Sequence, residues 1–169
     1  AKKLSMHGAN IVITGKTQSK HPKLEGTIYS AAESICEASQ RSNCIAVPCD
    51  VRVPNQIDVV IRETLDVFGS LNGVVLNASA LCLNNTINQT LKEINLMSEV
   101  NINGTFLMGK KCLEHIKDRS HSNILVIAPP IDMLNTDDWW VNHLYYSMSK
   151  FNMSLMAKFW DKEFPNVSV

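Results

Sequence analysis

The sequence predicts an α/β fold built around a mainly parallel sheet. Short apolar runs rich in β-branched residues alternate with amphipathic helical segments along the whole chain, which is the order expected of βαβ units. The first run, NIVITG at 10–15, has the composition of a strand buried on both faces. With 169 residues, 45% of them hydrophobic, the chain is long enough to bury a core, so residues 1–169 are expected to form a single domain.

Five segments have the composition of strands: 10–15, 43–51, 71–79, 123–128 and 166–169. Pro48 indicates that the second strand lies at an edge or ends there. The helix between the first two strands, at 26–41, is expected to bury one stripe of residues: Ile28, Ala31, Ala32, Ile35 and Cys36. The next helix is expected to open with Pro54, which suits a first turn, and to close at Gly69.

The second half of the sequence carries two further helical segments. Thr90 and Glu93 form a Thr-x-x-Glu capping box at the start of a segment that runs to about Lys117, with Gly104 interrupting it. The last helix bears Tyr146. An irregular loop is expected before it, with four bulky or rigid residues: Pro129, Pro130, Trp139 and Trp140.

Charge and cysteine content exclude several classes of protein. Sixteen basic and sixteen acidic side chains are interspersed, so no basic stripe predicts binding to nucleic acid or to an acidic membrane surface. No apolar run is long enough for a membrane span and no signal-peptide pattern is visible, which predicts an intracellular protein. The five cysteines form no CxxC pair and the five histidines are scattered, so reduced thiols and no metal site are expected.

Unusual residues follow the carboxyl ends of the predicted strands, where open α/β sheets bind ligands. These residues are Lys16 after the first strand, Asp50 and Val51 after the second, Asn77 and Ala78 after the third, and Ala128 after the fourth. The start of the last helix adds Tyr146 and Lys150. All of them are expected to meet in one crevice.

Tyr146 and Lys150 are four residues apart, a little over one helical turn, so the phenol and the ammonium lie on one face of the helix. They form either an ordinary pair of neighbours, which is common at this spacing, or an acid/base unit. In such a unit the ammonium favours the phenolate and lowers the pKa of the phenol from its usual value of about 10. The pair alone does not separate the two interpretations.

In order and spacing these residues resemble the short-chain dehydrogenase/reductase family. The resemblance rests on Asp50-Val51, Asn77-Ala78-Ser79 where the family has Asn-Ala-Gly, Asn101, and Tyr146-x-x-x-Lys150. It covers nearly the whole chain and is strongest with the hydroxysteroid dehydrogenase-like subgroup, through residues 8–35 and 76–81. The family resemblance implies a Rossmann-like, doubly wound parallel sheet, here truncated, with the first strand and the last strands missing.

The resemblance implies a bound nicotinamide nucleotide and hydride transfer between a carbonyl and an alcohol. Tyr146 is expected to act as acid/base, Lys150 to assist it and hold the nicotinamide ribose, and Asn101 to support a water-linked proton relay. The expected cofactor-binding residues are Lys16, Asp50, Val51, Asn77, Ala78, Ser79, Tyr146 and Lys150. Lys16 favours NADP over NAD because an ammonium pairs with the 2′-phosphate.

Four observations leave alternatives open. Lys16 is equally well explained as a solvated loop lysine, and Asp50 as a carboxylate that stabilises the helix after it. Ala128 stands where the family places a serine that hydrogen-bonds the reacting oxygen, and losing one such donor typically costs about 10²–10³ in rate; Thr136 is a candidate substitute. The Gly-rich phosphate loop is absent, and residues 1–8 resemble the tail of the helix that follows it. The rival interpretation is therefore a noncatalytic family member used for binding or assembly.

In the family's sheet the first strand lies between those at 10–15 and 71–77, so a vacancy is expected there. It is filled by direct pairing of those two strands, by a strand from another chain, or not at all, in which case the isolated chain is poorly stable. The expected partners are a small-molecule carbonyl or alcohol, a lipid-derived one included, and further copies of the chain in a homo-oligomer. The subgroup resemblance implies a peroxisomal or mitochondrial location; otherwise the cytoplasm is expected.

Overall fold

The computed structural model describes residues 1–20, 25–39, 43–130 and 138–169. The chain divides into two compact units, Ala1–Ser70 and Leu71–Val169. Every strand pair between described residues is parallel, which confirms the predicted α/β class with a parallel sheet. A single domain over residues 1–169 stays a prediction.

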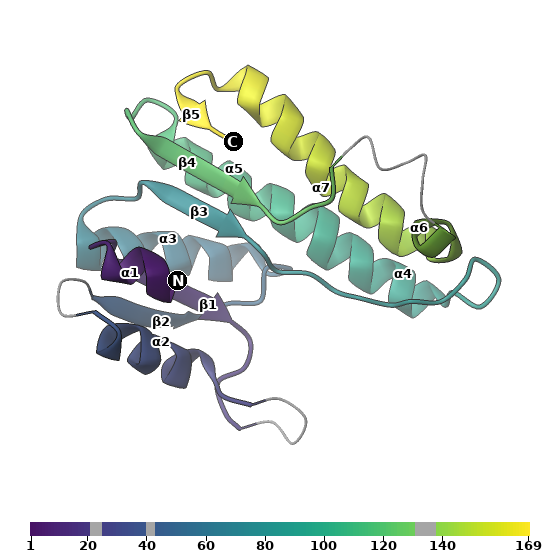
Figure 1. Ribbon diagram of the computed structural model, residues 1–169, viewed down its shortest axis with the longest axis horizontal. Coiled ribbons are helices and arrows are strands. Elements are labelled where there is room, and N and C mark those ends of the chain that lie inside the picture. The colour runs from purple at the N-terminus through teal and green to yellow at the C-terminus, as the bar shows by residue number, and fades with distance from the viewer. Residues whose placement is uncertain (21–24, 40–42, 131–137) are drawn as a thin grey trace. The chain divides into compact units, whose positions relative to one another are not determined.

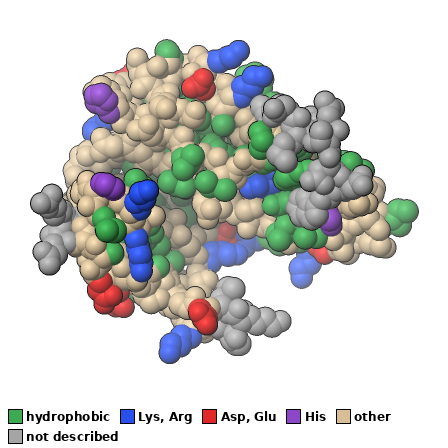
Figure 2. Space-filling view, viewed as in Figure 1, with side chains coloured by type: hydrophobic (Ala, Val, Ile, Leu, Met, Phe, Trp, Pro, Cys, Tyr) green, Lys and Arg blue, Asp and Glu red, His purple; other side chains and the backbone are tan. Residues whose placement is uncertain are grey.

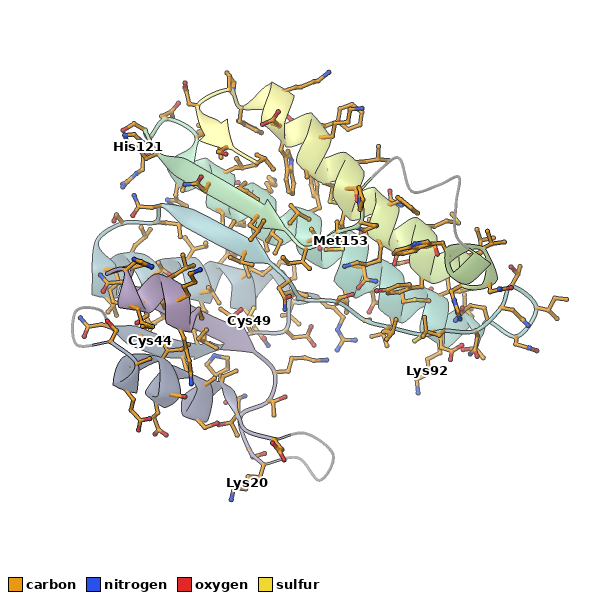
Figure 3. The ribbon with its side chains drawn as sticks, in the orientation of Figure 1. Lys20, Cys44, Cys49, Lys92, His121 and Met153 are labelled. Atoms are coloured by element: carbon orange, nitrogen blue, oxygen red, sulfur yellow. The ribbon has the colours of Figure 1, made fainter. Side chains whose placement is uncertain are left out.

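The first unit contains a two-stranded parallel sheet with helices packed on it (Figure 1). Its elements are α1 (Lys2–Met6), β1 (Ile11–Gly15), α2 (Ile28–Glu37), β2 (Cys44–Pro48) and α3 (Pro54–Phe68). β1 and β2 pair in register from Ile11 opposite Cys44 to Gly15 opposite Pro48. Pro48 is the last residue of β2, as predicted for a strand end, and Cys44 marks the other end of that strand in Figure 3.

Local side chains set the bounds of α2 and α3. Thr27 caps α2, because its hydroxyl accepts a hydrogen bond from the Ser30 N–H while the Ser30 hydroxyl accepts one from the Thr27 N–H. Pro54 opens α3, and Gly69 closes it with a φ of 71°, a left-handed conformation that suits glycine. Both bounds of α3 are those predicted from the sequence.

The buried stripe of α2 is narrower than predicted. Ile28, Ala32 and Ile35 are buried, whereas Ala31 and Cys36 are exposed. The buried residues follow the spacing i, i+4, i+7, so their side chains lie along one narrow face of the helix. The flanking positions Ala31 and Cys36 are therefore left exposed.

The second unit contains a three-stranded parallel sheet in the order β3–β4–β5, formed by β3 (Gly73–Leu76), β4 (Ser122–Val126) and β5 (Val167–Ser168). Three helical segments run in line, α4 (Leu91–Met97), η1 (Ser98–Gly104) and α5 (Thr105–Ile116). α6 (Asp138–Asn142) leads into α7 (Leu144–Glu163), which lies alongside them (Figure 1). Within the units, β1 pairs with β2 and β3 pairs with β4. How the vacancy expected between the strands at 10–15 and 71–77 is filled stays a prediction.

The long helical segment is interrupted by a π-helix. The capping box of Thr90 and Glu93 is confirmed at the start of α4, and α5 ends at Ile116, next to the predicted end. Between them η1 widens the helix over seven residues, and Gly104, the predicted interruption, is its last residue. π-segments inside α-helices are frequent at functional sites.

The core of the second unit lies around α7. Met153 is fully buried (Figure 3), and Trp160 is 5% exposed. The indole ring of Trp160 lies against the backbone of α5 at Gly109, where an added Cβ would collide with it, and the ring stacks on Phe106. The absence of a side chain at Gly109 therefore allows the close approach of α5 and α7.

Three sequence expectations concern the charged surface, membrane-spanning helices and the tryptophan segment. Charged side chains of both signs are scattered over the face shown in Figure 2. Among the described residues, no helix has both the length and the hydropathy to cross a membrane. Trp139 and Trp140, predicted in an irregular loop, lie in α6, whose five residues are too few to show a helical period in the sequence. Thr136 lies outside the described residues.

Candidate active site

The first unit carries a charged group at the carboxyl ends of its strands. Lys16 follows β1, and Asp50 follows β2. The Asp50 carboxylate accepts hydrogen bonds from Arg52, with Nη2 at 2.6 Å from Oδ2 and Nε at 3.0 Å from Oδ1. Lys16 Nζ lies 3.9 Å from the same Oδ2. The bonds from Arg52, followed by smaller effects that include Lys16, lower the pKa of Asp50 to about 2. Two cations therefore share one carboxylate.

Asp50 also orders the turn that leads into α3. Its Oδ1 accepts from the Arg52 N–H, its carbonyl accepts from the Val53 N–H, and its own N–H donates to Gln56 Oε1. This is close to the alternative role considered for Asp50, although the carboxylate binds Arg52 and not the first N–H groups of α3. Val51 lies in the turn and is partly exposed. The sequence interpretation missed Arg52, for which the Asp-x-Arg spacing was the available signal.

In the second unit, Asn101 of η1 ties the loop after β3 to α7. Its Oδ1 accepts from the Ala80 N–H at 2.7 Å, and its Nδ2 donates to the Ala80 carbonyl at 3.0 Å and to the Ser149 hydroxyl at 2.8 Å. Asn101 is fully buried, and a buried amide that lacks partners is costly. With both donors of the side chain used in these bonds, it acts as a clamp; the expected proton relay through Asn101 stays a prediction.

The three predicted cofactor-binding residues after β3 lie just before this clamp. Asn77, Ala78 and Ser79 are all exposed. The strand pairing continues up to them, since the Ile127 N–H donates to the Leu76 carbonyl at 3.1 Å. Backbone that is exposed and fixed at both ends is suited to approach a ligand closely.

Lys150 lies inside the second unit, only 7% exposed, on the side of α7 that faces the end of β4. Its ammonium donates to the Ile127 carbonyl at 2.7 Å, and burial lowers its pKa. One turn further along α7, Ser154 donates to the Pro129 carbonyl. Ala128 lies in the chain between Ile127 and Pro129, whose carbonyls accept these two hydrogen bonds, and it is partly exposed.

Tyr146 lies one turn before Lys150 and is partly exposed. Burial raises the pKa of its phenol, which is the opposite direction to the lowering expected from the neighbouring ammonium. Removing the phenol from water disfavours its charged form, and this burial is the cause of the rise. The Lys150 ammonium donates to the Ile127 carbonyl. The lowering of the Tyr146 pKa by Lys150, expected from the sequence, is therefore not found in this arrangement.

The aromatic ring of Trp140 lies beside that of Tyr146. The ring of Trp140 is nearly parallel to the phenol, at 4° with a centroid separation of 6.4 Å, and is tilted against Phe151 at 5.6 Å. The Ser147 hydroxyl donates to the Trp140 carbonyl at 2.7 Å and fixes α6 on α7. Trp140 thus packs beside the predicted acid/base residue.

The structure describes the predicted site residues as two groups, one in each unit. The first comprises Lys16, Asp50 and Val51, and the second comprises Asn77, Ala78, Ser79, Asn101, Tyr146 and Lys150. Their meeting in one crevice stays a prediction. Within the described ranges, no group of three His, Cys, Asp or Glu residues is arranged to hold a metal ion.

Comparison with known proteins identifies relatives over the whole chain. The family model described as short chain dehydrogenase matches residues 1–169. The chain is 40% identical over 159 residues to hydroxysteroid dehydrogenase-like protein 2 of Xenopus laevis, and 39% identical over 166 residues to the protein of that name from Homo sapiens. These alignments cover 93% and 97% of this chain but only 37% and 38% of the relatives.

Solved structures agree with this relationship. A short chain dehydrogenase from Mycobacterium thermoresistibile has a TM-score of 0.88 at 31% identity, over 97% of this chain and 57% of that one. A dehydrogenase/reductase from Sinorhizobium meliloti, at 21% identity, has a TM-score of 0.84 over 100% of this chain and 63% of its own length. At that identity the second likeness concerns the fold alone.

Proposed function

Because the chain belongs to the short-chain dehydrogenase family, we propose that it forms part of an NADP-dependent oxidoreductase acting on a carbonyl/alcohol pair. The observation that carries this proposal is the placement of Tyr146 and Lys150 on α7, which side-chain bonds anchor to η1 and to the end of β4. The bound nicotinamide supplies or accepts the hydride. The chain's own residues move the proton and hold the reactants.

Tyr146 is the proposed acid/base. In carbonyl reduction its hydroxyl gives a proton to the oxygen that gains negative charge, and in alcohol oxidation the phenolate takes that proton back. Lys150 has three N–H donors, of which the Ile127 carbonyl uses one, so two remain for the ribose hydroxyls of a nucleotide. A ligand that draws the ammonium toward Tyr146 would lower the pKa of the phenol and make it usable near neutral pH.

The charged group of the first unit supports NADP over NAD. Lys16 and Arg52 supply two positive charges against the single negative charge of Asp50. The Lys16 side chain is 59% exposed and lies 3.9 Å from the carboxylate, so it is loosely held. A 2′-phosphate competes well for such an ammonium, whereas an unphosphorylated ribose does not.

Exposed apolar residues support a lipid-derived substrate and a homo-oligomer. In the loop that follows Ala80, the residue bound by Asn101, the side chains of Leu81 and Ile87 are 58% and 94% exposed. On α7, exposed apolar residues at the spacing i, i+4, i+11, i+15 share one helix face: Leu144, Met148, Leu155 and Phe159. We assign the loop to binding an apolar substrate and the α7 face to contact with a second copy of the chain. Because a charge on that face would oppose such a contact, Phe159→Lys is expected to shift the sedimentation coefficient toward that of the monomer. A peroxisomal or mitochondrial location stays an expectation.

Ala128 favours the rival proposal of a noncatalytic family member. Its methyl group donates no hydrogen bond to a reacting oxygen, and it lies in the segment that Lys150 and Ser154 hold in place. The two proposals differ in what a serine at this position would do. In an enzyme limited by the missing donor, Ala128→Ser raises the rate of reduction by about 10²–10³, whereas a binding protein gains nothing.

The test uses the full-length protein with NADPH and decanal, an apolar aldehyde, and follows the loss of NADPH absorbance. We expect slow reduction by the unchanged protein, faster reduction by Ala128→Ser, and none by Ala128→Ser combined with Tyr146→Phe. Retained reduction in the Tyr146→Phe variant would remove Tyr146 from the mechanism. No reduction by either protein, together with unimpaired NADPH binding, would favour the noncatalytic alternative.

A further inference from the structure

Two side-chain hydrogen bonds join α7 to the π-helix η1, one turn apart. The hydroxyls of Ser98 and Tyr145 lie 2.5 Å from one another, and Asn101 Nδ2 donates to the Ser149 hydroxyl at 2.8 Å. Tyr145 and Ser149 are four residues apart on α7, and Ser98 and Asn101 are three apart on η1. The two bonds therefore form one seam between neighbouring helix faces.

The geometry of the seam bears on the rotation of α7 about its own axis. Two bonds one turn apart on the same face oppose rotation more strongly than one bond does, and they add to the packing of Met153 and Trp160. At the outer radius of a helix, about 5–6 Å, a rotation of roughly 10° moves a side-chain atom by about 1 Å. A misplacement of about 1 Å at a reacting group can cost about 10²-fold in rate.

Tyr146 is directly coupled to this seam. It follows Tyr145 in the sequence, and its carbonyl accepts a hydrogen bond from the Ser149 hydroxyl at 2.7 Å. Both residues that α7 contributes to the seam are thus linked to the backbone of Tyr146. A change in the seam alters where the phenol lies.

A further anchor of α7 near Tyr146 involves a group that the proposed function assigns to the cofactor. Lys150 donates to the Ile127 carbonyl, and this ammonium is the group that the proposed function assigns to the nicotinamide ribose. With two of its three N–H donors assigned to ribose hydroxyls, the ammonium would be shared between the Ile127 carbonyl and the ligand. The seam with η1 then holds the acid/base residue in place.

We infer that the Ser98–Tyr145 hydrogen bond is a positioning element for the reaction, which fixes the rotation of α7 and so the place of the Tyr146 hydroxyl. Tyr145 and Ser98 are positioning residues, since they act through Tyr146. The inference rests on the proposed function of Tyr146. Neither residue belongs to the motif by which the sequence resembles its family, so motif comparison alone would pass over both.

The first experiment is a double-mutant cycle on the full-length protein with NADPH and decanal. Tyr145→Phe and Ser98→Ala each remove one hydroxyl of the pair, and we expect each to lower kcat about tenfold with little change in KM for NADPH. The double variant should lose no more than either single variant, because both remove the same bond. Ser98→Thr, which keeps a hydroxyl, should restore most of kcat.

The matched control is Tyr29→Phe, which removes a tyrosine hydroxyl that bonds to Gln18 at 3.3 Å in the other unit. It should leave kcat unchanged. The inference is overturned if the Ser98→Ala and Tyr145→Phe variants keep wild-type kcat, or if their losses multiply in the double variant.

A second measurement needs neither cofactor nor turnover. With tyrosine labelled at the ring carbon that carries the hydroxyl, the NMR signal of Tyr146 is assigned by its loss in Tyr146→Phe. We expect Ser98→Ala to shift the Tyr146 signal and leave that of Tyr29 in place. If the unchanged protein reduces no aldehyde, the proposed function fails and this signal alone decides the inference: an unmoved Tyr146 signal overturns it.

Discussion

The two units hold their candidate site residues by different physical means. In the first unit, Lys16 and Arg52 surround the Asp50 carboxylate near the surface, and charge dominates. In the second unit, neutral side chains and backbone groups hold the residues in place, with Asn101 fully buried among its partners. The first arrangement attracts a ligand and depends on pH and salt, whereas the second fixes positions and depends on packing.

This difference indicates which functional property each unit determines. Exposed charges act over a distance but are weakened by counterions, so the first unit is suited to choosing between cofactors of different charge. Buried hydrogen bonds act only at contact but are barely affected by salt, so the second unit is suited to holding a reacting group. Changes in the first unit should thus alter cofactor affinity, and changes in the second should alter kcat.

The largest effect is expected at the Asn101 clamp. Asn101→Ala removes all three hydrogen bonds and leaves Ala80 and Ser149 without this partner, at about 1–3 kcal/mol for each buried group left unsatisfied. We expect kcat to fall by at least about tenfold and the urea midpoint of unfolding to drop, with both effects unchanged by salt. Asn103→Ala, at an exposed position of the same π-helix, is the matched control. A loss of cofactor affinity alone would contradict the division of roles.

A smaller effect is expected at Lys16. Lys16→Glu places a negative charge where the 2′-phosphate is proposed to bind, so the Kd for NADPH should rise about tenfold while that for NADH changes little. The difference should shrink as salt is raised from about 0.05 M to 0.5 M. Lys20→Glu, at an exposed lysine of the same loop (Figure 3), should change neither Kd. Equal affinities for both cofactors in the unchanged protein would remove the NADP assignment.

The smallest effect is expected from the ionisation of Asp50. Its pKa is lowered to about 2 in the folded protein, against an ordinary value of about 3.9, so its stabilising effect is complete above about pH 4 and disappears as the pH falls toward 2. Between about pH 4 and pH 2 the free energy of unfolding should therefore fall by about 0.5–1 kcal/mol less in Asp50→Asn than in the unchanged protein. This figure includes a reduction for solvent screening. Asp66→Asn, exposed on α3, is the control. Identical acid curves for both variants would show that the Arg52 pairing contributes nothing.

Elements with a local chemical cause could be predicted from the sequence. The capping box of Thr90 and Glu93, the proline at the start of α3 and the glycine at its end each act within one turn, and each is found as predicted. The five-residue α6 has no period to read, and no local signal distinguishes a π-helix from an α-helix that contains a glycine.

The candidate site was predictable in its residue types and less so in its contacts. Tyr146 and Lys150 could be placed on one helix face from their spacing alone. The partners of Asn101 could not be placed, because Ala80 and Ser149 lie 21 and 48 residues away in the chain. The direction of the Tyr146 pKa was also not predictable, since it depends on how far the folded chain buries the phenol.

The contact between Gly109 and Trp160 has a consequence for the history of the sequence. The indole ring occupies the volume that any side chain at position 109 would need. A mutation at either position alone is therefore disfavoured, either by a collision or by a cavity of indole size. Across descendants of this gene the two positions are expected to change together, with a larger residue at 109 accompanied by a smaller one at 160.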